Sequence, residues 1–275
     1  AYRKIRNTCR FVLSNLYDFD PDRDRVVYEE LPELDRWALM RLEDLKARVR
    51  RAYDQFEFHA IYHALNNFCS VDMSAVYLDI LKDRLYTFPA DSRARRGSQT
   101  VLHEIILAMT KLMAPILSFT AEEIWRSLSG RFAASLEAAS VHLTRFPEAK
   151  PEWQDQALIK RWDRLLEVRT AVQAALEEQR RSKVIGSSLE AVVEIQAKPD
   201  TYAFLKPYAG DLSALFIVSG AKLIEVHHLP QKADYLVSVS KATAKKCERC
   251  WNYREAVGTN AAHPTLCDRC VEALR

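Results

Sequence analysis

Cysteine is scarce in this chain: six of its 275 residues are cysteine, and four of those lie at or beyond position 247. Secreted proteins held together by disulfides carry many more, spread along the chain. The scarcity therefore argues against a disulfide scaffold. It predicts a reducing compartment, which we take to be the cytoplasm, and one local metal site near the C-terminal end.

Long apolar runs are also missing, since none approaches the ~18 residues that suggest a membrane span. The opening Ala1-Tyr2-Arg3-Lys4 leads directly into an amphipathic pattern, so no secretory signal is visible. We expect no membrane partner and a monomeric, globular protein. The sequence does not begin with Met, and we expect it to be a piece of a longer protein.

Charge of one sign is not in excess, because 40 Lys and Arg face 37 Asp and Glu, for a net charge of +3. That surplus lies in the tail: from Lys241 onward, seven basic residues exceed four acidic ones by three. A weakly basic protein with a basic tail is compatible with a polyanionic partner.

What the first part of the chain does contain is apolar residues spaced three and four apart, the period of helices that pack on one face. The pattern predicts a mainly α fold, with a helical bundle over 1–150. Pro21, Pro32, Pro89 and Pro147 mark breaks in it. The apolar stripes begin at Ile5, Leu34, Phe58 and Leu102, and the second of them extends to Phe56. Thr120 and Glu123 have capping-box spacing, which predicts a helix start there.

The second part changes in texture. A long connecting helix is expected within 151–183, from about Asp155 to Arg181, and Gly186 follows it. Short β-rich runs then predict a small α/β module over 184–240. Those runs are 192–195, 215–218, 223–226 and 236–239, with a helical stretch at 202–212 between the first two.

The tail, 241–275, holds two Cys-x-x-Cys pairs: Cys247 with Cys250, and Cys267 with Cys270. Each pair can form a tight knuckle that presents two sulfurs, and two knuckles complete a tetrahedron around one ion. All four positions are filled by protein, so no site is left for a reactive water. The spacing predicts a zinc ribbon with one structural zinc ion, whose binding folds the tail.

Four thiolates around Zn²⁺ carry a net charge of −2. Nearby basic residues could offset that charge or contact RNA, and the sequence leaves both open: Lys245, Lys246, Arg249 and Arg269. His263 is unnecessary as a ligand beside a complete cysteine set. The two remaining cysteines, Cys9 and Cys69, lie on helical stripes, where buried core thiols are expected.

Five blocks of sequence, in one order, resemble bacterial isoleucyl-tRNA synthetases. The blocks are residues 1–21, with Tyr2-Arg3-Lys4-Ile5-Arg6-Asn7; 68–86, with Lys82-Asp83-Arg84-Leu85-Tyr86; 113–123; 185–191; and the ribbon from Cys247 to Trp251. Together they cover nearly the whole chain. By this resemblance the bundle is an anticodon-binding domain, followed by the connecting helix, the module and the ribbon.

The same resemblance implies what the chain lacks. The family's HIGH and KMSKS motifs are absent, as is an editing insertion. A complete member joins isoleucine to its tRNA with ATP. We expect this chain to bind isoleucine tRNA at the anticodon stem and loop, beside catalytic and editing domains of the same polypeptide, and not to catalyse charging alone. ATP would bind only in the missing catalytic domain.

Candidate RNA contacts are basic or aromatic side chains, because phosphates are held by Lys and Arg and loop bases stack on rings. The resemblance carries over Arg3, Lys4, Arg6 and Asn7, and Arg10 shares the face of residues 3 and 6. A solvated face of ion pairs is the alternative. Further candidates are Arg180, Arg181, Lys183 and Trp251, while Arg93, Arg95 and Arg96 form a weaker basic cluster. Trp251 could instead cover the ribbon's small core.

Three alternatives remain at this stage. The chain could belong to a synthetase for valine, leucine or methionine, although the ribbon and opening block favour isoleucine. It could be a zinc-ribbon DNA-binding protein such as a repair glycosylase, although such enzymes have a β-rich body. It could also be a purely structural or protein-interaction module, which tRNA-selective binding would exclude.

Overall fold

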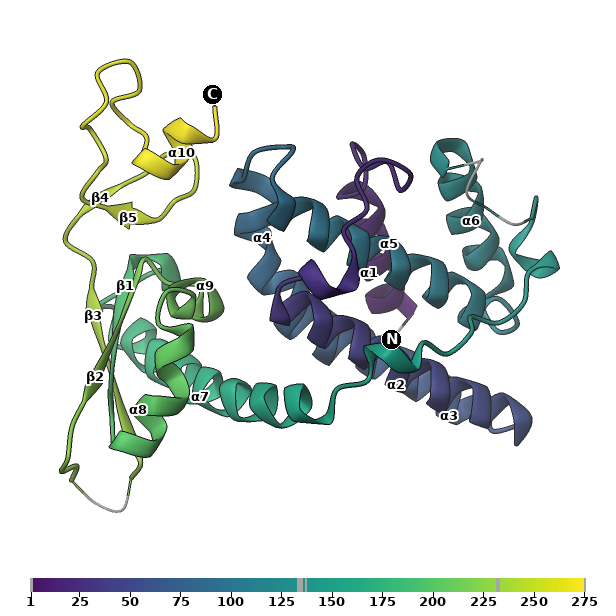
Figure 1. The fold of residues 1–275 in the computed structure, drawn as a ribbon, viewed down its shortest axis with the longest axis horizontal. Coiled ribbons are helices and arrows are strands. Elements are labelled where there is room, and N and C mark those ends of the chain that lie inside the picture. Colours follow the sequence, from purple (N-terminus) through teal and green to yellow (C-terminus); the bar gives the residue numbers. More distant parts are fainter. Residues whose placement is uncertain (1, 133–135, 137, 231–232, 275) are drawn as a thin grey trace. The chain divides into compact units, whose positions relative to one another are not determined.

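The computed structural model describes residues 2–132, 136, 138–230 and 233–274. The chain divides into two compact units. The first comprises Ala1–Leu85 with Ala90–Ile159, and the second comprises Tyr86–Pro89 with Lys160–Arg275. The mainly α fold is confirmed (Figure 1). The finer division into four parts, at 150, 183 and 240, stays a prediction.

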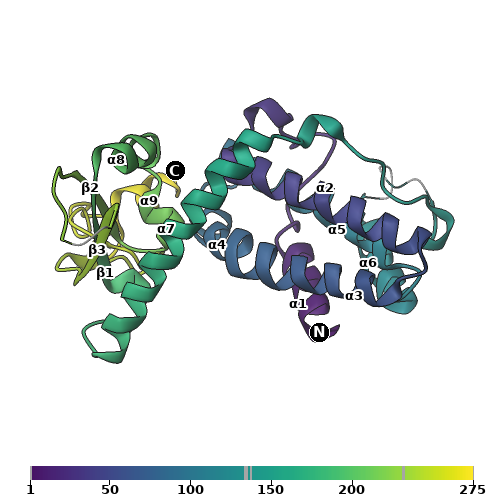
Figure 2. The same cartoon turned by 90° about the horizontal axis from the view of Figure 1, so that it is seen from below.

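The first unit is a bundle of helices. Its long elements are α1 (Tyr2–Ser14), α2 (Glu33–Asp54), α3 (Phe58–Asn67), the π-helix η2 (Phe68–Tyr77), α4 (Leu78–Thr87), α5 (Arg93–Met113) and α6 (Ser118–Phe132). Short 3-10 turns lie at η1 (Tyr28–Glu30), η4 (Val141–Leu143) and η5 (Pro151–Trp153). Figure 2 shows α2 and α3 running side by side in opposite directions.

The predicted stripes form the core of this bundle. Leu42 and Val49 on α2 are fully buried, as are Ile105 and Met109 on α5, which packs against α2. Trp125 on α6 is also fully buried. Burying one such aliphatic side chain contributes roughly 1.5–3 kcal/mol, so the 3.6-residue pattern accounts for the bundle.

Helices α3, η2 and α4 follow one another without a break, and the middle stretch is wound more widely. At its C-terminal end, the Leu78 N–H donates a hydrogen bond to the carbonyl of Met73, five residues earlier. Inside this stretch the buried Tyr77 hydroxyl donates to Asp35 at 2.6 Å, and Arg84 donates to the other Asp35 oxygen at 2.6 Å. Because Asp35 is fully buried, this network satisfies a carboxylate that would otherwise be costly.

Two local predictions for the bundle are wrong. Helix α6 begins at Ser118, so Thr120 is not its cap; the Thr120 hydroxyl bonds the Tyr2 hydroxyl at 3.0 Å instead. Helix α2 ends at Asp54, and Phe56 lies beyond it and is 79% exposed. Phe58, at the start of α3, is 51% exposed. Neither phenylalanine belongs to the core stripe.

The second unit contains α7 (Gln156–Arg181), most of the predicted connecting helix, and a three-stranded sheet in the order β2-β1-β3. Strand β1 (Ala191–Ala197) pairs in parallel with β2 (Gly220–Glu225) and antiparallel with β3 (Tyr235–Lys241). Alternate β1 residues from Ala191 to Ala197 are buried. Helices α8 (Pro199–Leu205) and α9 (Leu212–Phe216) join the two parallel strands, as a parallel pair requires.

One strand prediction in this unit is wrong, because residues 212–216 are helical. Leu212, Leu215 and Phe216 of α9 are buried, and the helix ends at Ile217, whose φ of 58° is left-handed. The apolar run Leu215-Phe216-Ile217-Val218 favoured a strand, and packing of the buried α9 side chains overrides that preference. The short turns η6 (Ser188–Glu190) and η7 (Lys206–Tyr208) complete the module.

The tail adds β4 (Lys245–Lys246), β5 (Tyr253–Arg254) and α10 (Asp268–Glu272). It is tied to the module by Ser219, whose hydroxyl donates to the Leu189 carbonyl and accepts from the Tyr253 N–H. Within the described parts of the chain, no helix has the length and apolar character that crossing a bilayer would require.

Candidate metal centre and RNA-binding surface

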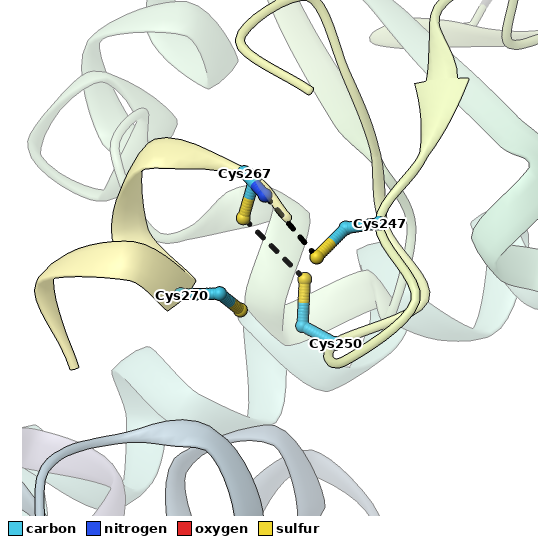
Figure 3. Close-up of side chains that lie close together, drawn as sticks. All are labelled: Cys247, Cys250, Cys267 and Cys270. Carbon is cyan, nitrogen blue, oxygen red and sulfur yellow. Dashed lines mark hydrogen bonds between the residues drawn. The ribbon is translucent and has the colours of Figure 1, made fainter. Parts of the chain in front are cut away.

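The four tail cysteines converge on one point. Their sulfur atoms all lie within 4.8 Å of one another, and all four residues are buried. Cys247 and Cys250 come from the turn after β4, whereas Cys267 and Cys270 come from the start of α10 (Figure 3). The Cys250 and Cys267 sulfurs are 3.8 Å apart. The predicted ligand set is therefore assembled as a tetrad.

Backbone amides favour the thiolate form of one of these four cysteines. Burial raises the pKa of the Cys247 thiol, but N–H groups of Cys250, Cys267 and Arg249 outweigh it and bring the pKa to about 6. Burial raises the pKa of Cys270 to about 12, against a hydrogen bond from the Arg249 side chain that lowers it. Thiolate is the form that binds zinc, so donors aimed at sulfur suit this use.

These donors fit a zinc ion. Four buried cysteine sulfurs suit tetrahedral Zn²⁺ with bonds of ~2.3 Å, and a complete cysteine set makes a closed, structural site. Val257 and Leu266 are the apolar residues packed around the tetrad. Because so small a core contributes little burial, the zinc ion supplies the stability of the ribbon when it is bound.

Trp251 follows the first knuckle and points outward. Its φ is 64°, its N–H donates to the Cys247 carbonyl at 2.9 Å, and its side chain is 60% exposed. The Lys246 ammonium lies 5.3 Å from the centre of the indole ring. The exposure contradicts the interpretation of Trp251 as a cover for the ribbon core, and leaves an aromatic face beside a cation.

The α1 candidates also lie in the open. Arg3, Lys4, Arg6, Asn7 and Arg10 are all exposed, and no side-chain hydrogen bond or ion pair joins any of them to another described residue. The alternative, a face of ion pairs, is therefore not what the described residues form. These side chains keep their donors available for an anion.

Part of this face borders a groove of about 470 Å³ between α1 and α6. Arg6 and Arg10 line it from α1, and hydroxyl groups of Ser14, Thr120 and Ser127 line it as well. Glu123 is the acidic member of the lining. Two guanidinium groups among hydroxyls can hold a phosphate by charge-assisted hydrogen bonds.

The other arginine cluster is different. Arg95 is 3% exposed and bonds both oxygens of Asp18, at 2.7 and 3.0 Å. Arg96 lies 3.4 Å from Asp24, and Arg93 pairs with Glu30. The weaker suggestion of RNA contact at these residues is wrong for Arg95 and Arg96, because they hold the loop after α1 to α5.

The candidate RNA contacts at the C-terminal end of α7 also include both engaged and accessible side chains. Arg180 donates to Glu177 at 2.8 Å and also to the Ser188 hydroxyl, which closes the loop after the helix. Arg181 is 80% exposed and lies 3.9 Å from Glu177. Lys183 is exposed at a φ of 57° and has no ion pair among the described residues. Arg181 and Lys183 are therefore the accessible cations here.

Two features of these surfaces were not predicted from the sequence. The α6 hydroxyls were not predicted as groove lining, since Thr120 was assigned to a helix cap, and Thr120 and Ser127 line the groove only when α6 packs on α1. Exposed aromatic rings at the α2–α3 turn were assigned to the core, because Phe56 and Phe58 fall on a helical rhythm. Helical periodicity extended across a turn is misleading there.

Comparison with known protein families identifies the family of this chain. The family model described as the anticodon-binding domain of tRNA ligase matches residues 35–195, and that described as a zinc finger found in FPG and IleRS matches residues 244–273. The first match covers more than half of the chain. The chain therefore belongs to the anticodon-binding domain family of tRNA ligases, and its ribbon is of the zinc-finger type.

Comparison with individual proteins shows which tRNA ligases this chain is similar to. The chain is 49% identical over 280 residues to the isoleucine–tRNA ligase of Geobacter sulfurreducens, and 50% identical over 282 residues to that of Syntrophotalea carbinolica. Each comparison covers 100% of this chain and 30% of the relative. The predicted resemblance to isoleucyl-tRNA synthetases is confirmed, and it is favoured over valine, leucine or methionine enzymes. The chain spans about 30% of the length of these relatives.

Proposed function

We propose that this chain is the tRNA-binding part of an isoleucine–tRNA ligase and binds the anticodon stem and loop of isoleucine tRNA. The observation that carries the proposal is the exposed basic face of α1, which forms no ion pair with any described residue, in a chain of the anticodon-binding family. Phosphate contacts of this kind supply affinity and fix the register of the RNA. Arg3, Lys4, Arg6, Asn7 and Arg10 make them.

Part of this phosphate contact lies in the groove between α1 and α6. Arg6 and Arg10 are one helical turn apart and line the same groove, so they can bracket one phosphate of the RNA backbone. The Ser127 hydroxyl already donates to the Glu123 carbonyl at 3.0 Å, and the Thr120 hydroxyl bonds the Tyr2 hydroxyl at 3.0 Å, so the two arginines supply the donors to this phosphate. The carboxylate of Glu123 disfavours a second anion beside it.

The second unit contributes its own contacts. Trp251 stacks on a base, with Lys246 close to its ring, and stacking of one base is worth ~1–3 kcal/mol. Arg181 and Lys183 hold phosphates near the end of α7. Arg180 is already engaged by Glu177 and Ser188, so we expect its substitution to act through the loop rather than on RNA.

The whole enzyme charges isoleucine tRNA with isoleucine and ATP, in the cytoplasm, through catalytic and editing domains outside this chain. The chain is a monomer that positions the tRNA for those domains. Pure protein should bind tRNA without charging it, and measurable formation of isoleucyl-tRNA would contradict this division of labour.

The test is equilibrium binding of the zinc-loaded protein to isoleucine tRNA, over a series of salt concentrations. Arg6→Ala combined with Arg10→Ala should weaken binding and reduce the salt slope by about 1, because contact with the one phosphate that the two arginines bracket is lost. Arg93→Ala is the control, since Arg93 is exposed but pairs with Glu30. A salt slope unchanged by the double substitution would refute the α1 contact.

A second arm compares native isoleucine tRNA with the same tRNA carrying a changed anticodon. A preference for the native anticodon supports recognition of the anticodon by this chain. Equal binding of both would assign discrimination to the rest of the enzyme and would contradict the anticodon-reading part of the proposal.

A further inference from the structure

The turn between α2 and α3 places a large aromatic residue where a glycine is usual. The Glu57 N–H bonds the Ala52 carbonyl at 2.8 Å and the Phe56 N–H bonds the Tyr53 carbonyl at 3.1 Å. This is the Schellman ending of a helix, and Phe56 occupies its left-handed position with a φ of 58°. That backbone conformation costs a side-chain-bearing residue roughly 1–2 kcal/mol.

Burial of the side chain does not offset this conformational cost, because Phe56 is 79% exposed. A strained residue with an exposed aromatic ring is a sign of use rather than of packing. In Figure 2 the turn forms the end of the paired helices α2 and α3. The ring is therefore presented at a tip of the first unit.

Phe56 is one of four connected rings. It meets Phe58 at 6.3 Å between ring centres and 84°, and Phe58 meets Tyr53 at 6.3 Å and 70°. Tyr53 stacks on Phe146 at 5.1 Å and 25°, and its hydroxyl donates to the Leu112 carbonyl of α5 at 2.9 Å. The inner rings thus support the outer ones. Because the Phe56 and Phe58 rings are nearly perpendicular, a base that stacks on one of them meets the other at an angle.

The surroundings carry cations that are available to an anion. Arg50 lies one turn before Tyr53 on α2, Arg51 lies in the last turn of α2, and Arg145 precedes Phe146; all three are exposed, and none has an ion pair with a described residue. Asp54 and Glu57 are exposed at the same turn. The net charge is therefore small, so binding there must come mainly from the rings, with the arginines directing phosphates around them.

We infer that Phe56 and Phe58 form a stacking platform for an unpaired base of an RNA loop. The inference rests on the proposed function and adds a base-binding site to it. A nucleobase fits because it offers a flat π-face to an exposed ring and carries a phosphate for the flanking arginines. The turn also lies within residues 35–195, the part that matches the anticodon-binding family.

The experiment measures affinity for two RNA hairpins with the same stem. One has an unpaired loop of ordinary nucleotides, and the other has abasic residues throughout the loop, so that phosphates remain and bases do not. Phe56→Gly should bind the ordinary hairpin about tenfold more weakly than the parent, the loss expected for one stacked base. It should bind the abasic hairpin as the parent does.

Unfolding does not confound this variant, because glycine is at ease in the left-handed conformation and should raise stability. Phe56→Leu keeps the apolar bulk and the backbone strain but removes the π-face, so it should lose affinity as the glycine variant does. Phe56→Trp should retain it. A leucine variant that binds like the parent would identify the turn as an apolar contact surface and overturn the stacking site.

The outcomes separate the two proposals. If Phe56→Gly binds both hairpins like the parent, while the Arg6 and Arg10 substitutions weaken both, the platform is refuted and the phosphate-binding face stands. If the parent protein binds neither hairpin nor isoleucine tRNA, the proposed function fails, and the platform fails with it.

Discussion

His103 on α5 is a buried imidazole. It is 3% exposed, and neither ring nitrogen has a hydrogen-bond partner among the described residues. It lies between Phe19, 5.7 Å away between ring centres, and Phe132, which meets it edge-on at 5.1 Å. Burial lowers the pKa of His103 from 6.5 to about 4, with a smaller opposing effect of Glu104.

The lowered pKa predicts acid sensitivity of the first unit. Between pH 6.5 and 4 the unfolded chain binds a proton at His103 and the folded chain does not, so stability is present above pH 6.5 and is lost as the pH falls. From pH 7 to pH 5 the loss from this group is about 2 kcal/mol. His103→Phe should remove that part of the loss in urea denaturation. His59→Gln, at an exposed histidine, should leave it; equal pH slopes for the parent and His103→Phe would disprove the assignment.

Lys183 makes a second prediction at residue scale. It occupies the left-handed position of a Schellman ending, since its N–H bonds the Arg180 carbonyl at 3.0 Å and the Val184 N–H bonds the Gln179 carbonyl at 3.0 Å. Lys183→Gly should therefore stabilise the second unit by about 1 kcal/mol. The same change should weaken tRNA binding and reduce the salt slope by about 1. A variant that is more stable but binds equally well would remove Lys183 from the RNA surface.

Among the elements, the N-terminal turn of α5 is held to the loop after α1 by charge. Arg95 bonds both carboxylate oxygens of Asp18, and Gln99 donates to Asp18 at 2.8 Å. Burial acts against ionisation, but hydrogen bonds from Arg95 and Gln99 lower the pKa of Asp18. The loop is thus fixed by a carboxylate that must stay charged.

Asp18→Asn should destabilise the first unit by roughly 2–3 kcal/mol, because it leaves the buried Arg95 guanidinium without its counter-charge. Urea denaturation at pH 7 measures this loss. Arg93→Ala, at an exposed pair, should change stability by less than about 1 kcal/mol. Under folding conditions Asp18→Asn should bind tRNA like the parent. A loss no larger than that of Arg93→Ala would mean that Arg95 finds another partner.

The elements also show what sequence can predict. Apolar stripes such as those of α2 and α5 specify helices because a 3.6-residue period is local. The strand predicted at 215–218 was wrong because Leu215 and Phe216 suit a strand equally well in sequence, and only packing places them in α9. The π-helix at residues 68–77 depends on how α3 and α4 pack, and no residue spacing in the sequence predicts it.

The candidate site residues also differ in whether local spacing or the folded chain identifies them. The zinc ligands were predictable because two knuckles are local spacings. The arginines at 3, 6 and 10 and those at 93, 95 and 96 look alike in sequence, yet only the second set forms ion pairs with described residues. Asp18, the partner of Arg95, is 77 positions away, so only the folded chain distinguishes the two sets.

At the scale of the whole molecule, the two units have separate sources of stability. The bundle is held by many buried aliphatic and aromatic side chains, whereas Val257 and Leu266 are the apolar residues found around the four cysteines in the described part of the ribbon. Its further anchorage in the second unit runs through Ser219, which joins the Leu189 carbonyl to the Tyr253 N–H. The ribbon should therefore depend on its metal ion, and the bundle should not.

Removing zinc tests that independence. Chelation, or Cys267→Ser, should release the ion and expose the amides of residues 245–274 to rapid hydrogen exchange, because the apolar core of the ribbon is too small to persist alone. The amides of α2 and α5 should stay protected, and Cys69→Ser is the control that should keep the zinc. If zinc content and tail protection survive Cys267→Ser, the tetrad is not the metal site. If the bundle loses protection together with the ribbon, the metal ion stabilises the whole molecule, and tRNA binding by α1 would then require zinc as well.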